Sequence, residues 1–446
     1  MLARGDVALR RPALAAVEAA LAAADPYEAT RALVRLDGRW LVVGDDRYDL
    51  DAAHRLLVLG AGKASLAIAR ALDEILDGRI DAGIVVAKYG DDGDLRQIRL
   101  RHAAHPVPDR AGLEAAEAIA RAAAGTGSGD IVIAAITGGS SALLPLPAPG
   151  LDLADKQAVN RLLLASGADI FEINAVRKHL SAIKGGRLAR LLHPGARLVN
   201  LTVSDVVGDA LDYITDPTVP DTSTLADARA TLDRYRLWER LPPRVARHLA
   251  EDGPAEETPK DLAPLSISSH VLVASTAAAE AARDTLSGAG FASRLHSTAL
   301  IGDSATAGRD FARLAREATT SGQRPAAIVA CGETTVRLEG EALGRGGPNQ
   351  EFAIAAAAAL PEDAAVLVLG LDTDGSDGPT ELAGALADAT SRARAADLGL
   401  DLQHHLDRHD ATTLALALGD GIRTGATGTN VNDLKLLLVG VPTARR

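Results

Sequence analysis

The 446-residue sequence is poor in two residue types that often decide how a protein is held together. Cys331 is its only cysteine, so no disulfide can form within the chain, as is typical of proteins in a reducing cytoplasm. Aromatic residues are limited to four Phe, five Tyr and two Trp, so the core must consist mainly of Ala, Leu, Val and Ile. Because 47% of the residues are apolar, a largely disordered chain is excluded.

Long apolar segments and long basic segments are also missing. No run approaches the roughly 18 to 20 apolar residues that a membrane helix needs. The charged N-terminal residues predict an amphipathic helix and not a signal peptide. A net charge of −12 without a basic run argues against nucleic acid and anionic membranes as partners. We therefore expect a cytoplasmic protein that acts on a small-molecule substrate, and a homodimer is one assembly that the sequence allows.

Strand-like apolar segments alternate with Ala-rich helical segments through most of the chain. This alternation predicts mainly parallel sheets that are covered by helices on both faces. Proline and acidic residues concentrate at 250–265, which we interpret as a linker. The sequence thus predicts two α/β domains, residues 1–260 and 261–446, with the active site in a cleft between them. The predicted strands are 56–59, 83–87, 131–136, 197–203, 270–274, 326–330, 364–370 and 434–439.

The segment RLLVLGAGKAS (55–65) predicts a buried strand, a glycine-rich turn and the start of a helix. Gly60 and Gly62 fit the first two glycines of the dinucleotide-binding pattern G-x-G-x-x-G, but Ser65 occupies the third position. Gly62 and Lys63 also fit part of a P-loop, whose first glycine and final Ser or Thr are missing here. Because the chain has only seven lysines, Lys63 is a candidate phosphate contact at the start of the helix. A lysine that only faces solvent is the alternative, and this segment alone favours it.

A second candidate phosphate loop follows the strand predicted to end at Ile136. Its two glycines allow an anion to approach the backbone closely, and its three hydroxyl groups can donate to phosphate oxygens. Ligands of parallel sheets usually bind where the strands end. The residues of this loop are Thr137, Gly138, Gly139, Ser140 and Ser141.

Basic residues gather in NAVRKHLSAIKGGRLA (174–189). If residues 174–184 are helical, Arg177 and Lys184 lie two turns apart on one face. The two glycines that follow would end this helix. Such side chains can clamp a carboxylate or phosphate. A solvent-exposed basic helix is the alternative that the pattern leaves open.

Acidic residues follow two further predicted strands. Asp205 comes just beyond strand 197–203, and Asp372, Asp374 and Asp377 lie in LGLDTDGSDGPT. Closely spaced Asp residues among glycines are typical of a hard-cation site, and Mg²⁺ prefers one or two carboxylates together with phosphate oxygens, so we predict a metal site among these residues. Ordinary Asp–Gly turns are the alternative.

His105 lies in AAHPVPD, before two prolines and a candidate helix cap, Asp109. We interpret this histidine as structural. The sequence has no Cys/His cluster of the kind that binds zinc and no G-x-S-x-G hydrolase motif.

Together these motifs supply the parts of a phosphoryl-transfer site, in which the protein mainly positions groups and neutralises charge. Their order and content closely resemble the glycerate 2-kinase family, whose second half is called the MOFRL domain. The resemblance extends from about residue 10 to residue 440. The motifs that carry it are LVLGAGKAS, HPVPD, ITGGSSALLPLP, NAVRKHLSAIKGGRLA, VSDVVGD, CGETTV, GGPNQEFAIA, TDGSDGPT and TGTNVNDL.

The resemblance implies a Rossmann-like N-terminal domain, a MOFRL-type C-terminal domain, and an ATP- and Mg²⁺-dependent kinase that converts D-glycerate to 2-phospho-D-glycerate. Lys63 matches the family's active-site lysine. The loop at 137–141 resembles the family's phosphate loop, SGGGSA, with Ser140 replacing a glycine. The implied ATP-binding residues are Gly60, Gly62, Thr137, Gly138, Gly139, Ser140 and Ser141.

Other site residues follow from the same resemblance. The acid substrate would be bound by Arg177, Lys184 and Asn349. Asp205 and Asp374 would help to hold Mg²⁺, and Asp205 is also the best candidate to take the hydroxyl proton.

The sequence departs from the family at Pro348 in GRGGPNQE, where arginine is usual. Proline supplies neither a charge nor an N–H group. Arg345 in the same loop is therefore the candidate catalytic replacement, and Arg177 is another. The change also leaves room for a different small sugar acid as substrate. Two further functions stay open, an NAD(P)H-dependent hydroxypyruvate reductase and a ligand-binding protein without catalysis.

Overall fold

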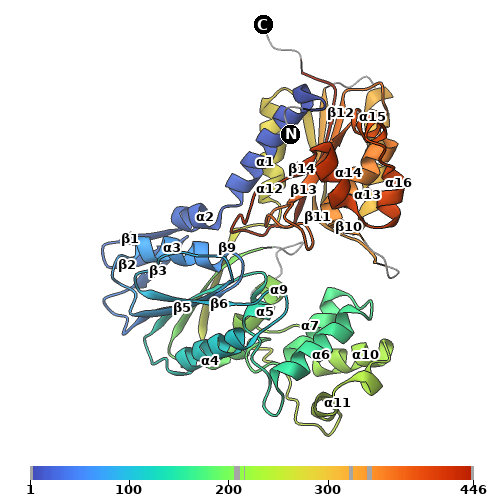
Figure 1. Ribbon diagram of the computed structural model, residues 1–446. Helices are drawn as coiled ribbons and strands as arrows, with labels where there is room; N and C mark the ends of the chain where they lie inside the picture. The colour runs from blue at the N-terminus through green and yellow to red at the C-terminus, as the bar shows by residue number, and fades with distance from the viewer. Residues whose placement is uncertain (1–3, 205–210, 215, 321–324, 339–343, 443–446) are drawn as a thin grey trace. The chain divides into compact units, whose positions relative to one another are not determined.

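The computed structural model describes residues 4–204, 211–214, 216–320, 325–338 and 344–442 (Figure 1). The chain forms two units. The first consists mainly of residues 26–204 and 209–272, and the second mainly of residues 1–25 and 273–446. None of the helices in the described part of the chain is long and apolar enough to cross a membrane.

The central sheet of the first unit contains β4 (Leu56–Ala61), β5 (Ala82–Lys88), β6 (Ile98–Ala103), β7 (Ile131–Ile136), β8 (Arg197–Val203) and β9 (Ser266–Val273). The strand order is β6-β5-β4-β7-β8-β9, and the pairs from β6 to β8 are parallel. The chain runs outward from β4 to β6 on one side and from β7 to β8 on the other. The strand order therefore reverses between β4 and β7, which confirms the predicted Rossmann-like arrangement.

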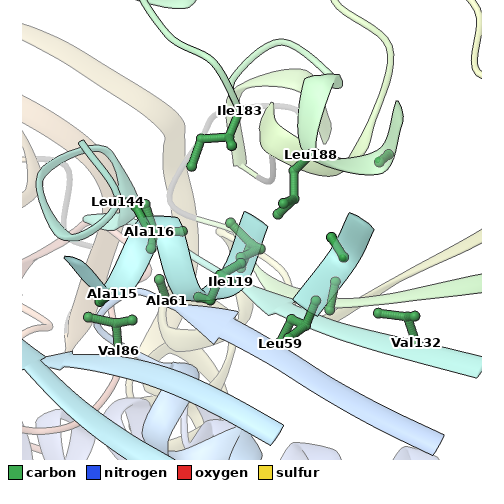
Figure 2. Packing of buried hydrophobic residues seen from close by; sticks show 14 of the residues in the cluster. Leu59, Ala61, Val86, Ala115, Ala116, Ile119, Val132, Leu144, Ile183 and Leu188 are labelled. Carbon is green, nitrogen blue, oxygen red and sulfur yellow. The ribbon is translucent and has the colours of Figure 1, made fainter. Parts of the chain in front are cut away.

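Helices α3 (Ser65–Ile75) and α4 (Arg110–Ala124) cover opposite faces of this sheet (Figure 1). Alternate strand residues point to each face, so Leu59 of β4 packs with Ile119 of α4 in one buried cluster. Ile183 belongs to the same cluster, as Figure 2 shows. The segment around residue 183 is thus packed against the sheet through apolar side chains.

The rest of the first unit is a helical layer and a small antiparallel sheet. Apolar side chains of the helical layer share one buried cluster, contributed by α6 (Leu153–Leu164), α7 (Ile170–His179), α10 (Leu225–Arg234) and α11 (Pro243–Leu249). Asp152 and Asp169 start α6 and α7 in capping boxes. The small sheet consists of β1 (Val34–Asp37), β2 (Trp40–Val43) and β3 (Asp46–Asp49). The remaining α-helices are α2 (Pro26–Leu33), α5 (Ser140–Leu143), α8 (Arg187–Arg190) and α9 (Leu211–Ile214).

Residues 250–265 do not form the predicted linker. Thr258 is buried, and its hydroxyl group donates to Asp221 Oδ2 at 2.7 Å. Glu257 Oε1 lies 3.0 Å from Nε2 of His179 at the end of α7. The polar side chains of this segment therefore anchor it to the helical layer.

The sheet of the second unit contains β10 (Ala292–Asp303), β11 (Ala326–Thr335), β12 (Val366–Asp372), β13 (Gly384–Asp388), β14 (Gly421–Ile422) and β15 (Asp433–Val439). Their order is β10-β11-β15-β12-β13-β14. Strands β10 and β11 pair in parallel, whereas the other four pairs are antiparallel because β15 and β13 run against their neighbours. The mainly parallel pairing predicted for both domains is found in the first unit, while this sheet is mixed.

Helices cover both faces of the second sheet (Figure 1). They are α1 (Val7–Ala23), α12 (Ala277–Gly288), α13 (Ser304–Thr320), α14 (Pro348–Ala359), α15 (Ser391–Asp397), α16 (Leu402–Asp407) and α17 (Ala411–Leu418). Phe311 of α13 and Phe352 of α14 meet edge to face, with ring centroids 5.0 Å apart. Two of the chain's few aromatic residues thus lie together in this core.

The two units divide the chain differently from the predicted boundary at 260/261. Helix α1 belongs to the second unit because Arg10 is fully buried there and pairs with Asp388 at 2.6 Å and Asp420 at 2.8 Å. Strand β9, on the C-terminal side of the predicted boundary, belongs to the sheet of the first unit. Arg10 and Asp388 are 378 residues apart, so local sequence could not reveal their contact.

Candidate active site

The two glycine-rich loops of the first unit lie together, at the ends of β4 and β7. The Thr137 N–H donates to the Ala61 carbonyl at 3.0 Å, and the Lys63 N–H donates to the Gly138 carbonyl at 2.9 Å. The Ala64 N–H donates to the Thr137 hydroxyl oxygen at 3.2 Å. The structure thus brings Lys63 next to the predicted phosphate loop, at the position where the strand order reverses.

Two predicted ATP-binding glycines are required because the neighbouring strand and loop are so close. A Cβ atom on Gly60 would lie 2.8 Å from the Ala135 carbonyl oxygen. Gly62 has a φ of +139°, and a Cβ atom there would lie 2.2 Å from Thr137 Oγ1. Both glycines therefore hold β4 and its turn against β7 and its loop, a role that does not itself depend on a nucleotide.

The side chains of His105 and Lys63 both lie next to Gly139 in the same loop. This glycine has a φ of +88°, and a Cβ atom there would lie 3.3 Å from Nε2 of His105 and 3.4 Å from Cγ of Lys63. Ser140 is buried at the start of α5, and Ser141 is half-buried beside it. Lysine, imidazole and hydroxyl groups are therefore gathered around one turn.

His105 is the residue of this group that sequence reasoning interpreted as structural. Its loop follows β6, so it leaves the same edge of the sheet as the loops after β4 and β7. The loop is held at Pro108, whose carbonyl accepts from Gln157 Nε2 at 2.6 Å, and at Asp109, which accepts from Tyr89 Oη at 2.9 Å. The position of His105 just after a strand could have pointed to this edge of the sheet. However, β6 carries charged residues and was not predicted as a strand.

Helix α7 ends at His179, so Arg177 and Lys184 do not lie on one helix as predicted. The half-buried Arg177 donates to the side-chain oxygen of Asn160 on α6. Burial lowers the pKa of Arg177, and within the described part of the chain no carboxylate pairs with it. Lys178, in contrast, is buried in an ion pair with Asp221 at 2.6 Å.

Lys184 lies in a turn that follows an isolated antiparallel bridge between Ser181 and Pro147. The Ala182 N–H donates to the Leu146 carbonyl at 3.2 Å, and the Ala148 N–H donates to the Leu180 carbonyl at 3.0 Å. Lys184 itself is buried, with 6% of its surface exposed. These backbone contacts, and not a helix, connect the basic segment to the loop that begins at Thr137.

Of the two predicted metal ligands, Asp205 lies outside the described residues. Asp374 follows β12 in the second unit and is nearly buried. Its Oδ1 accepts from the Ser376 N–H at 2.8 Å, and its own N–H donates to Asp372 Oδ1 at 3.0 Å. In the described part of the chain, no three His, Cys, Asp or Glu side chains are grouped so that they could hold a metal ion by themselves.

Asp377, in the same loop, fixes the start of α14. Its carboxylate accepts from the N–H groups of Asn349 at 2.9 Å and Gln350 at 2.8 Å. Burial raises the pKa of Asp377 to about 6. The Asn349 amide group also donates to Asp433 Oδ1 at 2.8 Å and accepts from buried Lys435. This internal network was missed from the sequence, and a role of Asn349 in substrate binding remains a prediction.

Pro348 is the first residue of α14, a position where a missing N–H group costs no helical hydrogen bond. Arg345 lies just before it with an exposed side chain that pairs with Glu381. Its N–H donates to Asp410 Oδ1 at 3.1 Å, and its carbonyl accepts from the Thr412 N–H at 2.9 Å. The backbone of Arg345 is therefore anchored while its side chain meets solvent.

Two family profiles match the chain. Residues 12–250 match the domain of unknown function DUF4147, and residues 326–433 match the MOFRL family. Together they span both halves of the sequence.

Known relatives match almost the whole length of the chain. A glycerate 2-kinase from Pyrococcus horikoshii is 36% identical over 437 residues, which is 97% of each chain. A protein from Agrobacterium vitis with the provisional name of hydroxypyruvate reductase is 43% identical over 390 residues, which is 86% of this chain and all of the other. The solved structure of a glycerate kinase from Thermotoga maritima is 34% identical, with a TM-score of 0.81 over 97% of this chain and 99% of that one.

Proposed function

The chain belongs to the glycerate 2-kinase family, and on that premise we propose that it transfers the γ-phosphoryl group of ATP to the 2-hydroxyl of D-glycerate. The products would be 2-phospho-D-glycerate and ADP. The observation that supports this best is the contact between the Lys63 turn and the loop at 137–141, where the strand order reverses. Open α/β sheets bind ligands at this position, and a lysine beside hydroxyl groups suits phosphate.

Phosphoryl transfer asks the protein mainly for positioning and charge stabilisation. A bond forms between the substrate's 2-hydroxyl oxygen and the γ-phosphorus, and the bond from that phosphorus to the bridging oxygen of ADP breaks. We assign Lys63 to the charge on the transferring group. Gly138, Gly139, Ser140 and Ser141 would hold the nucleotide phosphates.

Asp205 and Asp374 are the proposed contacts of Mg²⁺, directly or through water. The nearly buried Asp374 offers a carboxylate, and Mg²⁺ in kinases is commonly held by few carboxylates plus phosphate oxygens. When bound, the ion would neutralise negative charge on the phosphates. Asp205 is also the proposed acceptor of the hydroxyl proton.

Arg177 is the proposed partner of the substrate carboxylate. Its half-buried guanidinium group is held by an amide oxygen of Asn160, which leaves its positive charge uncompensated by that contact. Lys184 and Asn349 are the other proposed substrate contacts. Arg345 would supply the positive charge that the family's usual arginine supplies at the position of Pro348.

A coupled assay of ADP release tests the proposal with purified protein, ATP and Mg²⁺. The acid panel contains D-glycerate, L-glycerate, tartrate and longer sugar acids. We expect release with D-glycerate, formation of the 2-phosphate, and near-complete loss of activity in Lys63→Ala. Arg70→Ala is the matched control, because it removes an exposed positive charge from the following helix, α3.

The outcomes separate the candidate functions. ADP release with a different acid only would assign a different substrate to the same reaction. Oxidation of NADH or NADPH by hydroxypyruvate, without ADP release for any acid, would contradict the kinase and support the reductase. ATP binding without any turnover would indicate a protein that has kept the site and lost catalysis.

A further inference from the structure

We propose that His105 is a catalytic residue that donates a hydrogen bond to the phosphoryl group held at the Gly138–Gly139 turn, alongside Lys63. The inference rests on the proposed kinase function and adds a residue that the sequence motif alone did not assign to the site. Its basis is the placement of the imidazole ring, which comes from a different strand than Lys63 and yet flanks the same glycine.

The geometry at Gly139 carries the argument. A single methyl group placed on this glycine would touch both His105 Nε2, at 3.3 Å, and Lys63 Cγ, at 3.4 Å. The glycine also has a φ of +88°, which favours a residue without Cβ. The His105 ring and the Lys63 side chain therefore both lie against Gly139, on the side where its Cβ atom would be. A phosphate group bound at this turn would lie next to the imidazole ring and within reach of the flexible lysine side chain.

The loop that carries His105 is anchored at its C-terminal end. Its loop is hydrogen-bonded through Pro108 to Gln157 and through Asp109 to Tyr89. Asp109 also caps α4 by accepting from the Gly112 N–H at 2.9 Å. Anchoring of the loop reduces the backbone freedom that is lost when a ligand binds, and preorganised donors of this kind stabilise charge effectively.

His105 gains and loses no proton in this role. The bond changes are those of the transfer described above, and the hydroxyl proton goes to the acceptor proposed there. His105 and Lys63 would share the negative charge on the non-bridging oxygens of the phosphoryl group.

The test compares two replacements of the ring. His105→Gln keeps an N–H donor near the position of Nε2, whereas His105→Phe keeps an aromatic ring without a donor. Isothermal titration with ATP and Mg²⁺, without any acid, gives the dissociation constant, and the coupled assay gives kcat and KM. We expect ATP affinity to fall about 10- to 100-fold in the Phe variant, the range for loss of a hydrogen bond to a charged group. The Gln variant should stay within about threefold of wild type.

His102→Gln is the matched control. His102 is on β6 three residues earlier, where its Nε2 lies 2.9 Å from the Asp91 carbonyl oxygen and its ring stacks on Tyr89. This variant should bind ATP like wild type. Thermal unfolding of all variants checks that they fold, and His105→Asn replaces the Phe variant if that variant does not.

Three results would overturn the proposal. ATP affinity that is unchanged in His105→Phe would show that the ring does not touch the phosphates. Equal losses of kcat in the Gln and Phe variants, with unchanged ATP affinity, would make His105 a base instead. A loss of ATP affinity in His102→Gln as large as that in His105→Phe would indicate a purely structural effect. If wild type binds ATP but does not phosphorylate D-glycerate, the substrate assignment fails, while the titration still decides the role of His105.

Discussion

Gly62 and Thr137 approach each other so closely that a Cβ atom on Gly62 would lie 2.2 Å from the Thr137 hydroxyl oxygen. The same hydroxyl oxygen accepts from the Ala64 N–H. The turn after β4 and the loop after β7 are thus locked together by contacts that leave no space for a side chain. The precision of the proposed phosphate site depends on this pair.

Gly62→Ala is therefore expected to damage the site. The methyl group must displace Thr137, and the φ of +139° is unfavourable for alanine. We expect kcat/KM to fall about 100-fold, the loss that a displacement of about 1 Å can cause in an active site. Gly38→Ala is the control, since Gly38 also has a positive φ but no neighbour within 4 Å. It should lower stability slightly and leave kcat/KM unchanged, and similar activity in both variants would contradict the argument.

Arg345 and Arg423 are a matched pair for testing which residue supplies the positive charge that is missing at Pro348. Both guanidinium groups lie next to the carboxylate of Glu381. If Arg345 supplies the positive charge that Pro348 lacks, Arg345→Ala should lower kcat/KM about 10- to 100-fold. Arg423→Ala should change it less than about threefold. Equal losses of kcat/KM in the two variants would show that positive charge near Glu381 contributes without a specific role for Arg345. If neither variant changes kcat/KM, Arg177 remains the candidate for the charge that Pro348 lacks.

The raised pKa of Asp377 leads us to predict that the stability of the protein depends on pH. Burial and the neighbouring charge of Asp433 raise its pKa to about 6, against the hydrogen bonds from Asn349 and Gln350. The unfolded chain, with a value of 3.8, releases this proton first as the pH rises. The contribution of Asp377 to the free energy of unfolding is therefore fully present below about pH 4 and is lost by about pH 7, by roughly 3 kcal/mol.

Asp377→Asn removes this titration. The difference in unfolding free energy between wild type and the variant should shrink as the pH rises from 4.5 to 7. Urea denaturation followed by circular dichroism measures it at each pH. A difference that grows with pH would contradict burial as the dominant influence on the Asp377 carboxyl group.

Substitution of Arg10 tests whether helix α1 contributes to the stability of the second unit. Arg10→Ala removes the fully buried partner of Asp388 and Asp420 and leaves them paired only with the less buried Arg394, which should lower the free energy of unfolding by about 3 kcal/mol. Arg11→Ala, at the exposed next position, should change it by less than about 0.5 kcal/mol.

Because both tryptophans, Trp40 and Trp238, lie in the first unit, their fluorescence reports on that unit alone. Hydrogen exchange in β12 and β13 reports on the second unit. We expect Arg10→Ala to change exchange there and to leave the fluorescence transition in place. Loss of the fluorescence transition instead would show that the two units unfold together.

Much of the first unit follows from local sequence. Strands 131–136 and 197–203 were predicted at their observed bounds, because continuous apolar runs between helices indicate buried parallel strands. The Lys63 turn and the loop at 137–141 were recognised because each follows such a strand. Strand β6 was not predicted, since its charged residues hide the apolar pattern, and the sequence therefore did not show that His105 leaves the same sheet edge as Lys63.

The sequence by itself determined the family, the α/β class and the two glycine-rich loops, because these depend on residues that are neighbours in the chain. Only the tertiary structure decided which distant residues meet. It placed His105 beside Lys63, ended α7 before Lys184, and moved α1 into the second unit through Arg10. Contacts of this kind join residues tens to hundreds of positions apart, so their energies depend on burial and geometry that no local pattern of the sequence encodes.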